Sequence, residues 1–117
     1  MSSLKITTRD AATGPVLEIF GALDYDTAPR LRELLATLAL RPGQRLVLDL
    51  GGVEFCDSSG ITSLIAAHHH ARAAQADVEL AAVPARILRT LRIVGLDQIF
   101  VIHPGGDGVS PAEDGVG

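Results

Sequence analysis

The most informative stretch of this 117-residue chain reads LVLDLGGVEFCDSSG, from Leu46 to Gly60. Its first five residues are apolar apart from one aspartate, which is typical of a central strand that is buried on both faces. Gly51 and Gly52 are expected to end that strand, and Val53–Asp57 to lead into a helix. The helix would begin with two serines and a glycine. Because a helix start has unpaired N–H groups and a partial positive charge, side chains there are well placed to carry or meet an anion.

Apolar periodicity on either side of this stretch predicts the remaining elements. Strands are expected at residues 4–9, 16–20, 46–50, 78–82 and 99–102, with Gly21 ending the second. Asp26 or Thr27 can cap the first helix, and Pro84 starts the third. Gly95 is expected as a left-handed C-cap of the third helix, with Leu96 folding back onto it. The apolar faces expected for the three helices are Leu31, Leu34, Leu35 and Leu38; Ile61, Leu64, Ile65 and His68; and Ile87, Leu88, Leu91 and Val94.

This order of elements predicts an α/β fold in a single domain. The short turn at residues 10–14 predicts a hairpin, so the first strand is antiparallel to the second. The later strands alternate with helices, which implies right-handed crossovers and a mixed, mostly parallel sheet of about five strands with three or four helices. The domain is expected to span residues 1–103. Residues 104–117 are rich in glycine, proline and acids, which predicts a disordered tail. The strand order does not follow from the sequence.

Composition and charge narrow the function classes. The net charge of −4 leaves no basic footprint for nucleic acid. The single cysteine cannot form an internal disulfide, which fits a reducing cytosol. The N-terminus has no apolar signal-peptide core, and no apolar run approaches the roughly 20 residues of a membrane span. These features predict a cytoplasmic protein that contacts neither nucleic acid nor membrane.

Most catalytic and cofactor motifs are missing from the sequence. The P-loop pattern is absent, since the only lysine is Lys5, and so are the dinucleotide fingerprint and the late lysine of receiver domains. A serine hydrolase would need glycine two residues before Ser58, where Cys56 stands. Three consecutive histidines, 68–70, point in different directions on a helix, so a metal site is not expected there. No cofactor, metal site or catalytic residue is therefore predicted, although a small hydrolase using Ser58 or Cys56 stays an alternative.

The third predicted helix carries Arg86, Arg89 and Arg92 on its outer side. Such a row is most often a solvated helix face, and a partner-facing or phosphate-sensing surface is the alternative.

The DSSG element has a similar pair of interpretations. In the structural one, Asp57 or Ser58 caps the helix and Gly60 relieves a close contact.

The ordered chain from about Leu4 to His103 resembles the STAS-domain anti-sigma-factor antagonists of bacteria. Three stretches carry the resemblance. They are GALDYDT at residues 21–27, the strand and loop of residues 46–61 with its DSSG element, and the segment from Val83-Pro84 to Gly95-Leu96. Two departures from the family pattern are Ala22, where a charged residue is frequent, and the triple histidine.

The resemblance implies a binding protein and kinase substrate, not an enzyme. It maps the phosphorylated serine onto Ser58 and leaves Ser59 as first-turn helix structure. The implied partners are an anti-sigma factor serine kinase, which the unphosphorylated protein binds so that the sigma factor is released, and a PP2C-type phosphatase that resets the switch. The protein itself would be a monomer or weak dimer. An alternative within the family is a non-phosphorylated adaptor subunit, for example of a lipid-transport complex. Partner contacts are expected from Asp24, Asp57, Ser58, Ser59, Gly60 and Ile61.

Overall fold

The computed structural model describes residues 3–105. Most of the predicted tail, residues 106–117, lies outside the described residues. The structure describes the first two residues of the predicted tail, 104 and 105, and Pro104 belongs to the last strand. The elements in chain order are β1 Leu4–Ala11, β2 Gly14–Leu23, α1 Ala28–Thr37, β3 Arg45–Cys56, α2 Ser58–Ala73, β4 Asp77–Val83, α3 Ala85–Ile93, the 3-10 helix η1 Leu96–Gln98 and β5 Val101–Pro104.

The five strands form one mixed sheet in the order β1-β2-β3-β4-β5. β1 pairs antiparallel with β2 through a hairpin, and the other neighbours pair in parallel. The predicted α/β class, strand number and antiparallel first strand are therefore confirmed. Within residues 3–105 no helix is long and apolar enough to cross a membrane.

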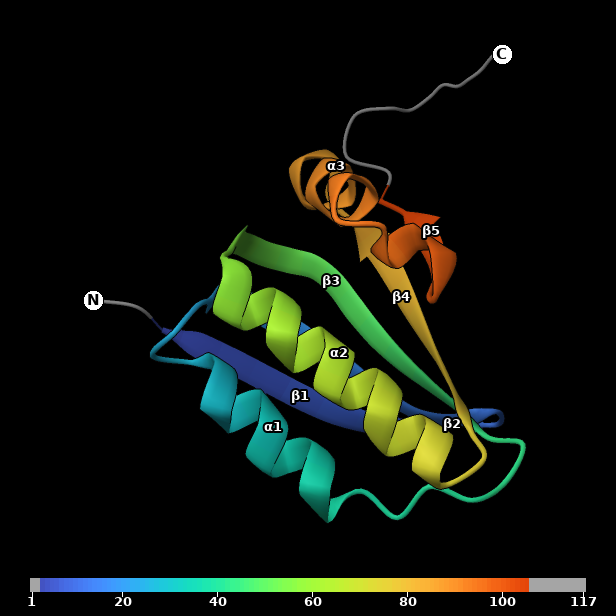
Figure 1. Ribbon diagram of the computed structural model, residues 1–117. Helices are drawn as coiled ribbons and strands as arrows, with labels where there is room; N and C mark the ends of the chain where they lie inside the picture. The colour runs from blue at the N-terminus through green and yellow to red at the C-terminus, as the bar shows by residue number, and fades with distance from the viewer. Residues whose placement is uncertain (1–2, 106–117) are drawn as a thin grey trace.

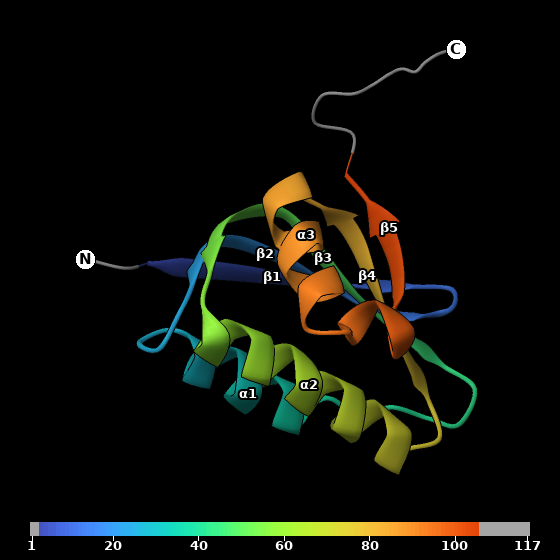
Figure 2. The same cartoon turned by 45° about the horizontal axis from the view of Figure 1, so that its top comes forward.

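The sequential strand order determines where the helices lie. Each parallel neighbour is reached through a crossover, and crossovers of the usual right hand place their helices on one face of a sheet with sequential strand order. Figures 1 and 2 show α1 and α2 side by side across that face. The buried side chains of all three helices join those of the strands in one core cluster. No helix of residues 3–105 covers the other face of the sheet, and on it Phe20 is 42% exposed.

This one-sided cover corrects the prediction that β3 is buried on both faces. Leu46, Leu48 and Leu50 are buried, whereas Val47 and Asp49 between them are only half-buried. β3 therefore follows the alternation of a strand with one covered face.

The prediction that Gly51 and Gly52 end the strand is also wrong, because β3 continues to Cys56. Gly52 pairs with Phe20 of β2, and a Cβ at Gly52 would lie 2.3 Å from the Phe20 ring. The glycine thus lies at a close approach within the sheet, and not in a turn. β2 likewise runs past Gly21 to Leu23.

The helices begin near the predicted positions, but each predicted apolar face is only partly buried, and the difference is largest in α2 and at the end of α3. The buried residues of α2 are Gly60, Ser63, Leu64, Ala67 and Ala71, while the predicted Ile61, Ile65 and His68 are half-buried. Small residues face inward because α2 packs against both α1 and the sheet.

After α3 the chain follows the predicted cap and then departs from the prediction. Gly95 has a φ of 82° and Leu96 is buried, as expected for a left-handed cap. Val94, expected on the apolar face, is instead 54% exposed beyond the helix end. The amide of Ile99 donates to the Leu96 carbonyl in the 3-10 turn, so β5 begins at Val101 and not at Ile99.

Candidate functional site

The predicted site residues gather where β2 and β3 end and α1 and α2 begin. These two parallel strands are neighbours, so the loops that follow them lie at the same edge of the sheet. The register pairs Leu23 with Cys56, the last residues of the two strands. The loop after β2, which contains Asp24, therefore lies beside the loop that leads to Ser58.

Asp57 joins the two loops. Its Oδ1 accepts a hydrogen bond of 3.0 Å from the amide of Gly60, which caps α2. Its Oδ2 accepts one of 3.2 Å from the amide of Tyr25, and its own amide donates to the Leu23 carbonyl at 3.3 Å. Of the two cap residues that the sequence allowed, Asp57 is the one used. The same carboxylate fixes the start of α2 to the loop after β2.

Asp24 organises the loop in which it lies. Its Oδ1 accepts hydrogen bonds from the amides of Asp26 and Thr27, at 3.0 and 3.1 Å. Thr27 occupies the N-cap position of α1 and is buried, but its side chain makes no cap hydrogen bond. Its hydroxyl lies 2.7 Å from the Ala22 carbonyl, to which it donates, and accepts from the Asp24 amide. The loop before α1 is thus held by its own side chains.

Ser58 is the first residue of α2, and its side chain is exposed. Within residues 3–105 its hydroxyl makes no hydrogen bond, so it is accessible at the positive end of the helix. Ser59 is half-buried and lines a different surface, a pocket of about 420 Å³ between the starts of α1 and α2. The other lining residues are Tyr25, Asp26, Pro29, Arg32 and Thr62.

Gly60 and Ile61 hold the helix start against the core. A Cβ at Gly60 would lie 2.3 Å from the Leu23 carbonyl oxygen and 2.7 Å from the Cys56 sulfur, which agrees with the expectation that this glycine relieves a close contact. Ile61 is half-buried and packs against the core cluster. Burial raises the pKa of the Cys56 thiol to about 12, and the adjacent Asp57 carboxylate adds to that rise. The thiol is therefore protonated at neutral pH, which argues against a nucleophilic cysteine.

The histidines lie away from Ser58. His68 is ten residues further along α2, which is about 15 Å along a helix axis. It makes an edge-on contact with Phe100, while His70 lies 3.1 Å from the Leu38 carbonyl. His103 pairs with Glu79 at 2.9 Å. Among the described residues no three His, Cys, Asp or Glu side chains gather in a way that could hold a metal ion.

Two exposed aromatic residues flank the site and were not predicted as contact residues. Tyr25 is 77% exposed in the loop after β2. Phe55 is 53% exposed and lies near the end of β3, three residues before Ser58. Both stand next to predicted site residues in a chain with only one tyrosine and three phenylalanines. An aromatic residue next to a site motif, in a chain so poor in aromatic residues, is the sequence signal that could have identified them as contact residues.

Comparison with known proteins agrees with this fold. Residues 6–103 match the family model described as "Mlab, STAS domain". The anti-sigma-B factor antagonist of Listeria monocytogenes is 31% identical over 102 residues, which cover 86% of this chain and 87% of that protein.

Solved structures give the same result. The crystal structure of an anti-sigma factor antagonist from Mycobacterium paratuberculosis superposes with a TM-score of 0.77 at 27% identity, covering 90% of this chain and 89% of that one. The Bacillus cell fate determinant SpoIIAA in its phosphorylated form gives a TM-score of 0.66 at 16% identity, covering 88% and 95% of the two chains, and this similarity shows the fold alone. With the family match over residues 6–103 and the 31% identity to a relative across most of both chains, the chain belongs to the STAS domain family.

Proposed function

We propose that this chain is a cytoplasmic anti-sigma factor antagonist controlled by phosphorylation of Ser58. Its unphosphorylated form binds an anti-sigma factor serine kinase and so releases the sigma factor. Phosphorylation abolishes that binding, and a PP2C-type phosphatase restores it. The observation that carries the proposal is the placement of Ser58, whose exposed hydroxyl follows a helix cap that is anchored to the neighbouring loop. The names of the Listeria and Mycobacterium relatives support the same role.

The electrostatics of this position suit a switch. A phosphate adds about −1.5 to −2 charges, and the positive end of α2 can accept them without loss of the fold. A bound partner would instead face a desolvated dianion. An unpaired buried charge costs about 3–5 kcal/mol, which weakens binding on the order of 100- to 1000-fold or more. Charge at the interface is therefore sufficient to dissociate the complex, without a large conformational change.

The surroundings of Ser58 fit a surface residue that another protein modifies, and they fit a hydrolase active site less well. A nucleophilic serine needs a base within hydrogen-bonding reach. The α2 histidines begin about 15 Å along the helix axis from Ser58, and His103 pairs with Glu79 of β4. With Cys56 held protonated, neither hydroxyl nor thiol is activated among the described residues.

The test is phosphorylation of the purified chain by the small serine kinases of its own organism. The wild type should gain one phosphate in intact-mass measurements, and Ser58→Ala should gain none. Ser59→Ala is the matched control and should be phosphorylated like the wild type. Phosphate on Ser59, or none with any of these kinases, would overturn the proposal.

A second candidate is a non-phosphorylated adaptor subunit, for example of a lipid-transport complex. The family model that matches this chain is described by the name Mlab and not as a sigma-factor regulator, which favours this candidate. An adaptor would hold its partners irrespective of ATP, whereas the antagonist would be released from its kinase once ATP is added. Co-purification of the partner with and without ATP separates the two.

A further inference from the structure

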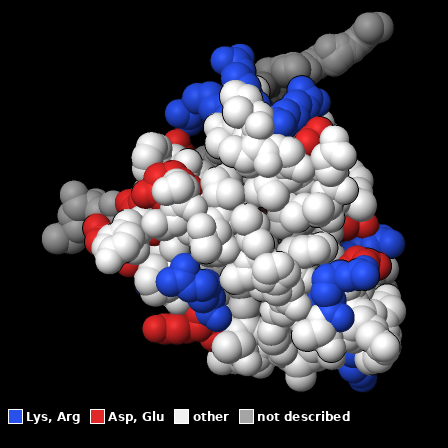
Figure 3. Space-filling model, in the orientation of Figure 1, with Lys and Arg blue, Asp and Glu red and all other residues white. Residues whose placement is uncertain are grey.

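Helix α3 presents a positive surface that the proposed function has not used. Arg86, Arg89, Thr90 and Ile93 are exposed and share one side of the helix, because residues three, four and seven apart lie on the same face. We call these four residues the α3 outer stripe. Figure 3 shows basic side chains gathered at the top of the view, over α3. The helix contains three arginines and no acid, although the whole chain has a net charge of −4.

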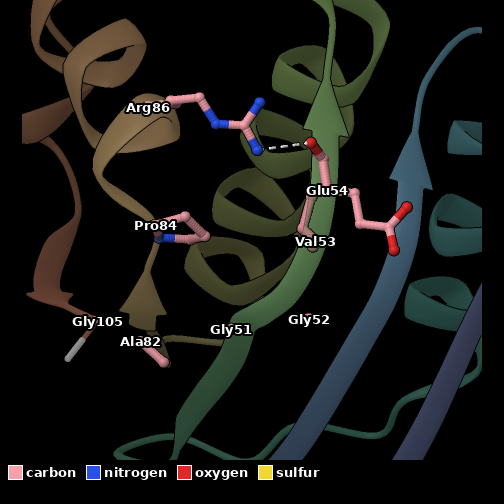
Figure 4. A pocket seen from close by; sticks show the side chains of 8 residues that line it. All are labelled: Gly51, Gly52, Val53, Glu54, Ala82, Pro84, Arg86 and Gly105. Carbon is pink, nitrogen blue, oxygen red and sulfur yellow. Dashed lines mark hydrogen bonds between the residues drawn. The ribbon is translucent and has the colours of Figure 1, made fainter. Parts of the chain in front are cut away.

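Internal contacts do not explain these arginines fully. Arg86 donates from Nη2 to the Glu54 carbonyl at 3.0 Å, and Figure 4 shows the guanidinium reaching across from α3 to β3. Arg89 makes no hydrogen bond or ion pair within residues 3–105. Arg92, outside the stripe, stands in the last helical turn, where a cation is favoured by the helix dipole. Among residues 3–105, Arg89 therefore has no partner, and it stands in the middle of the helix rather than at its end.

An exposed apolar residue accompanies this charge. Ile93 is 78% exposed, one turn beyond Arg89 on the same face. An arginine beside an exposed aliphatic side chain is typical of protein interfaces, in which arginine is enriched and apolar groups fill the centre.

The stripe is continuous with the segment that leads to Ser58. A groove of about 180 Å³ separates the end of β3 from α3, and its lining residues are Glu54, Phe55, Cys56, Arg86, Ile87 and Thr90. Figure 1 shows the same neighbourhood, with the end of β3 beside α3. A protein that covers the Ser58 loop and the exposed Phe55 therefore lies next to Arg86 and Thr90.

We propose that the α3 outer stripe is a second contact surface for the partner that binds the Ser58 loop, and that this partner presents carboxylates to Arg86 and Arg89 around an apolar site for Ile93. The inference rests on the proposed function. A nucleic acid or an anionic membrane is an extended polyanion, so it would also face the rest of the molecule, whose net charge is negative. The charge distribution therefore favours a protein partner whose acidic surface is local. A local carboxylate meets mainly the arginines, because screening at physiological salt acts over about 8 Å.

The test measures association and dissociation rates of the kinase identified by Ser58 phosphorylation, at low and physiological salt. Arg89→Glu should slow association about tenfold at low salt and reduce its salt dependence, as expected when an interface charge is reversed. Arg89→Lys keeps the charge and should behave like the wild type. Arg41→Glu is the matched control, since it reverses an exposed arginine in the loop after α1. Ile93→Ser should accelerate dissociation several-fold, and thermal melting checks that each variant folds.

Each outcome bears on a defined claim. Equal association rates for Arg89→Glu and Arg41→Glu, whether both like the wild type or both slowed, would overturn the inference but leave the proposed function intact. A wild-type dissociation rate for Ile93→Ser would remove the apolar part of the contact. If the wild-type chain bound no kinase, the proposed function and this inference would fall together.

Discussion

Replacing Asp57 with alanine should loosen the start of α2 and separate it from the loop after β2. The carboxylate makes two hydrogen bonds that alanine cannot make, to the Gly60 amide at 3.0 Å and to the Tyr25 amide at 3.2 Å. Loss of a helix N-cap costs about 0.5–2 kcal/mol. Loss of the second hydrogen bond, which is solvent-exposed, adds about 0.5–1.5 kcal/mol.

The expected loss in the free energy of unfolding is thus about 2 kcal/mol. For a domain of this size that corresponds to a melting temperature lower by roughly 10 °C. Asp57→Asn keeps an oxygen for the Gly60 amide but turns an amide NH2, which cannot accept, toward the Tyr25 amide. It should therefore keep the cap, lose the second hydrogen bond and the interaction of the charge with the helix dipole, and cost about 1–2 kcal/mol.

Urea unfolding followed by circular dichroism measures these differences. Asp26→Ala is the control, because Asp26 is an exposed aspartate of the same loop and only its backbone amide is hydrogen-bonded in the described structure. Its effect should stay within about 0.5 kcal/mol. The reasoning would be refuted if Asp57→Ala unfolded at the wild-type urea concentration, or if Asp57→Asn, which cannot accept from the Tyr25 amide while it caps α2, were as stable as the wild type.

Three further changes test other parts of the site. Gly60→Ala places a Cβ 2.3 Å from the Leu23 carbonyl oxygen. The cost of overpacking, about 1–3 kcal/mol, should exceed the gain in helix propensity of up to about 1 kcal/mol, so the variant should be less stable. A more stable variant in urea unfolding would contradict this. Thr27→Val removes the hydroxyl that bonds the Ala22 carbonyl, and should cost about 1–3 kcal/mol in the same assay, where wild-type stability would be the contrary result. The rise in the pKa of Cys56 from 9.0 to about 12 lowers the fraction of thiolate at pH 8. Iodoacetamide should therefore alkylate the folded protein roughly 1000-fold more slowly than the urea-unfolded protein, and equal rates would contradict the raised pKa.

The architecture was largely predictable because each element carries a local signal. The turn at residues 10–14 specified the hairpin, and the spacing of leucines such as Leu31 and Leu35 specified α1, in which both are buried. Gly95 and Leu96 predicted the end of α3 for the same reason, since a left-handed cap depends on neighbouring residues only.

The errors arose where distant contacts decide the local structure. Gly51 and Gly52 predict the end of β3, but the Phe20 ring of the neighbouring strand β2 occupies the space of a side chain at Gly52. The inward face of α2 could not be predicted from hydrophobicity, because helix packing on two sides selects small residues such as Ala67 and Ala71. The one-sided cover of the sheet follows from strand order, which no local signal encodes.

The candidate site was predictable in its residues but not in its connections. The DSSG element identified Asp57 and Ser58, and the structure places them beside the loop that contains Asp24. The hydrogen bond from the Tyr25 amide to Asp57 joins residues 32 positions apart, so no local pattern indicates it. The exposure of Tyr25 and Phe55 likewise depends on how the two loops fold.

The central claim is that the charge on Ser58 determines whether the kinase binds. The most direct measurement is calorimetric titration of the kinase with two forms of the chain, one unphosphorylated and one phosphorylated on Ser58 alone, both shown to fold by circular dichroism. We expect the phosphorylated form to bind about 100-fold more weakly or worse, because its dianion would be desolvated at the interface. Equal dissociation constants for the two forms would contradict the account.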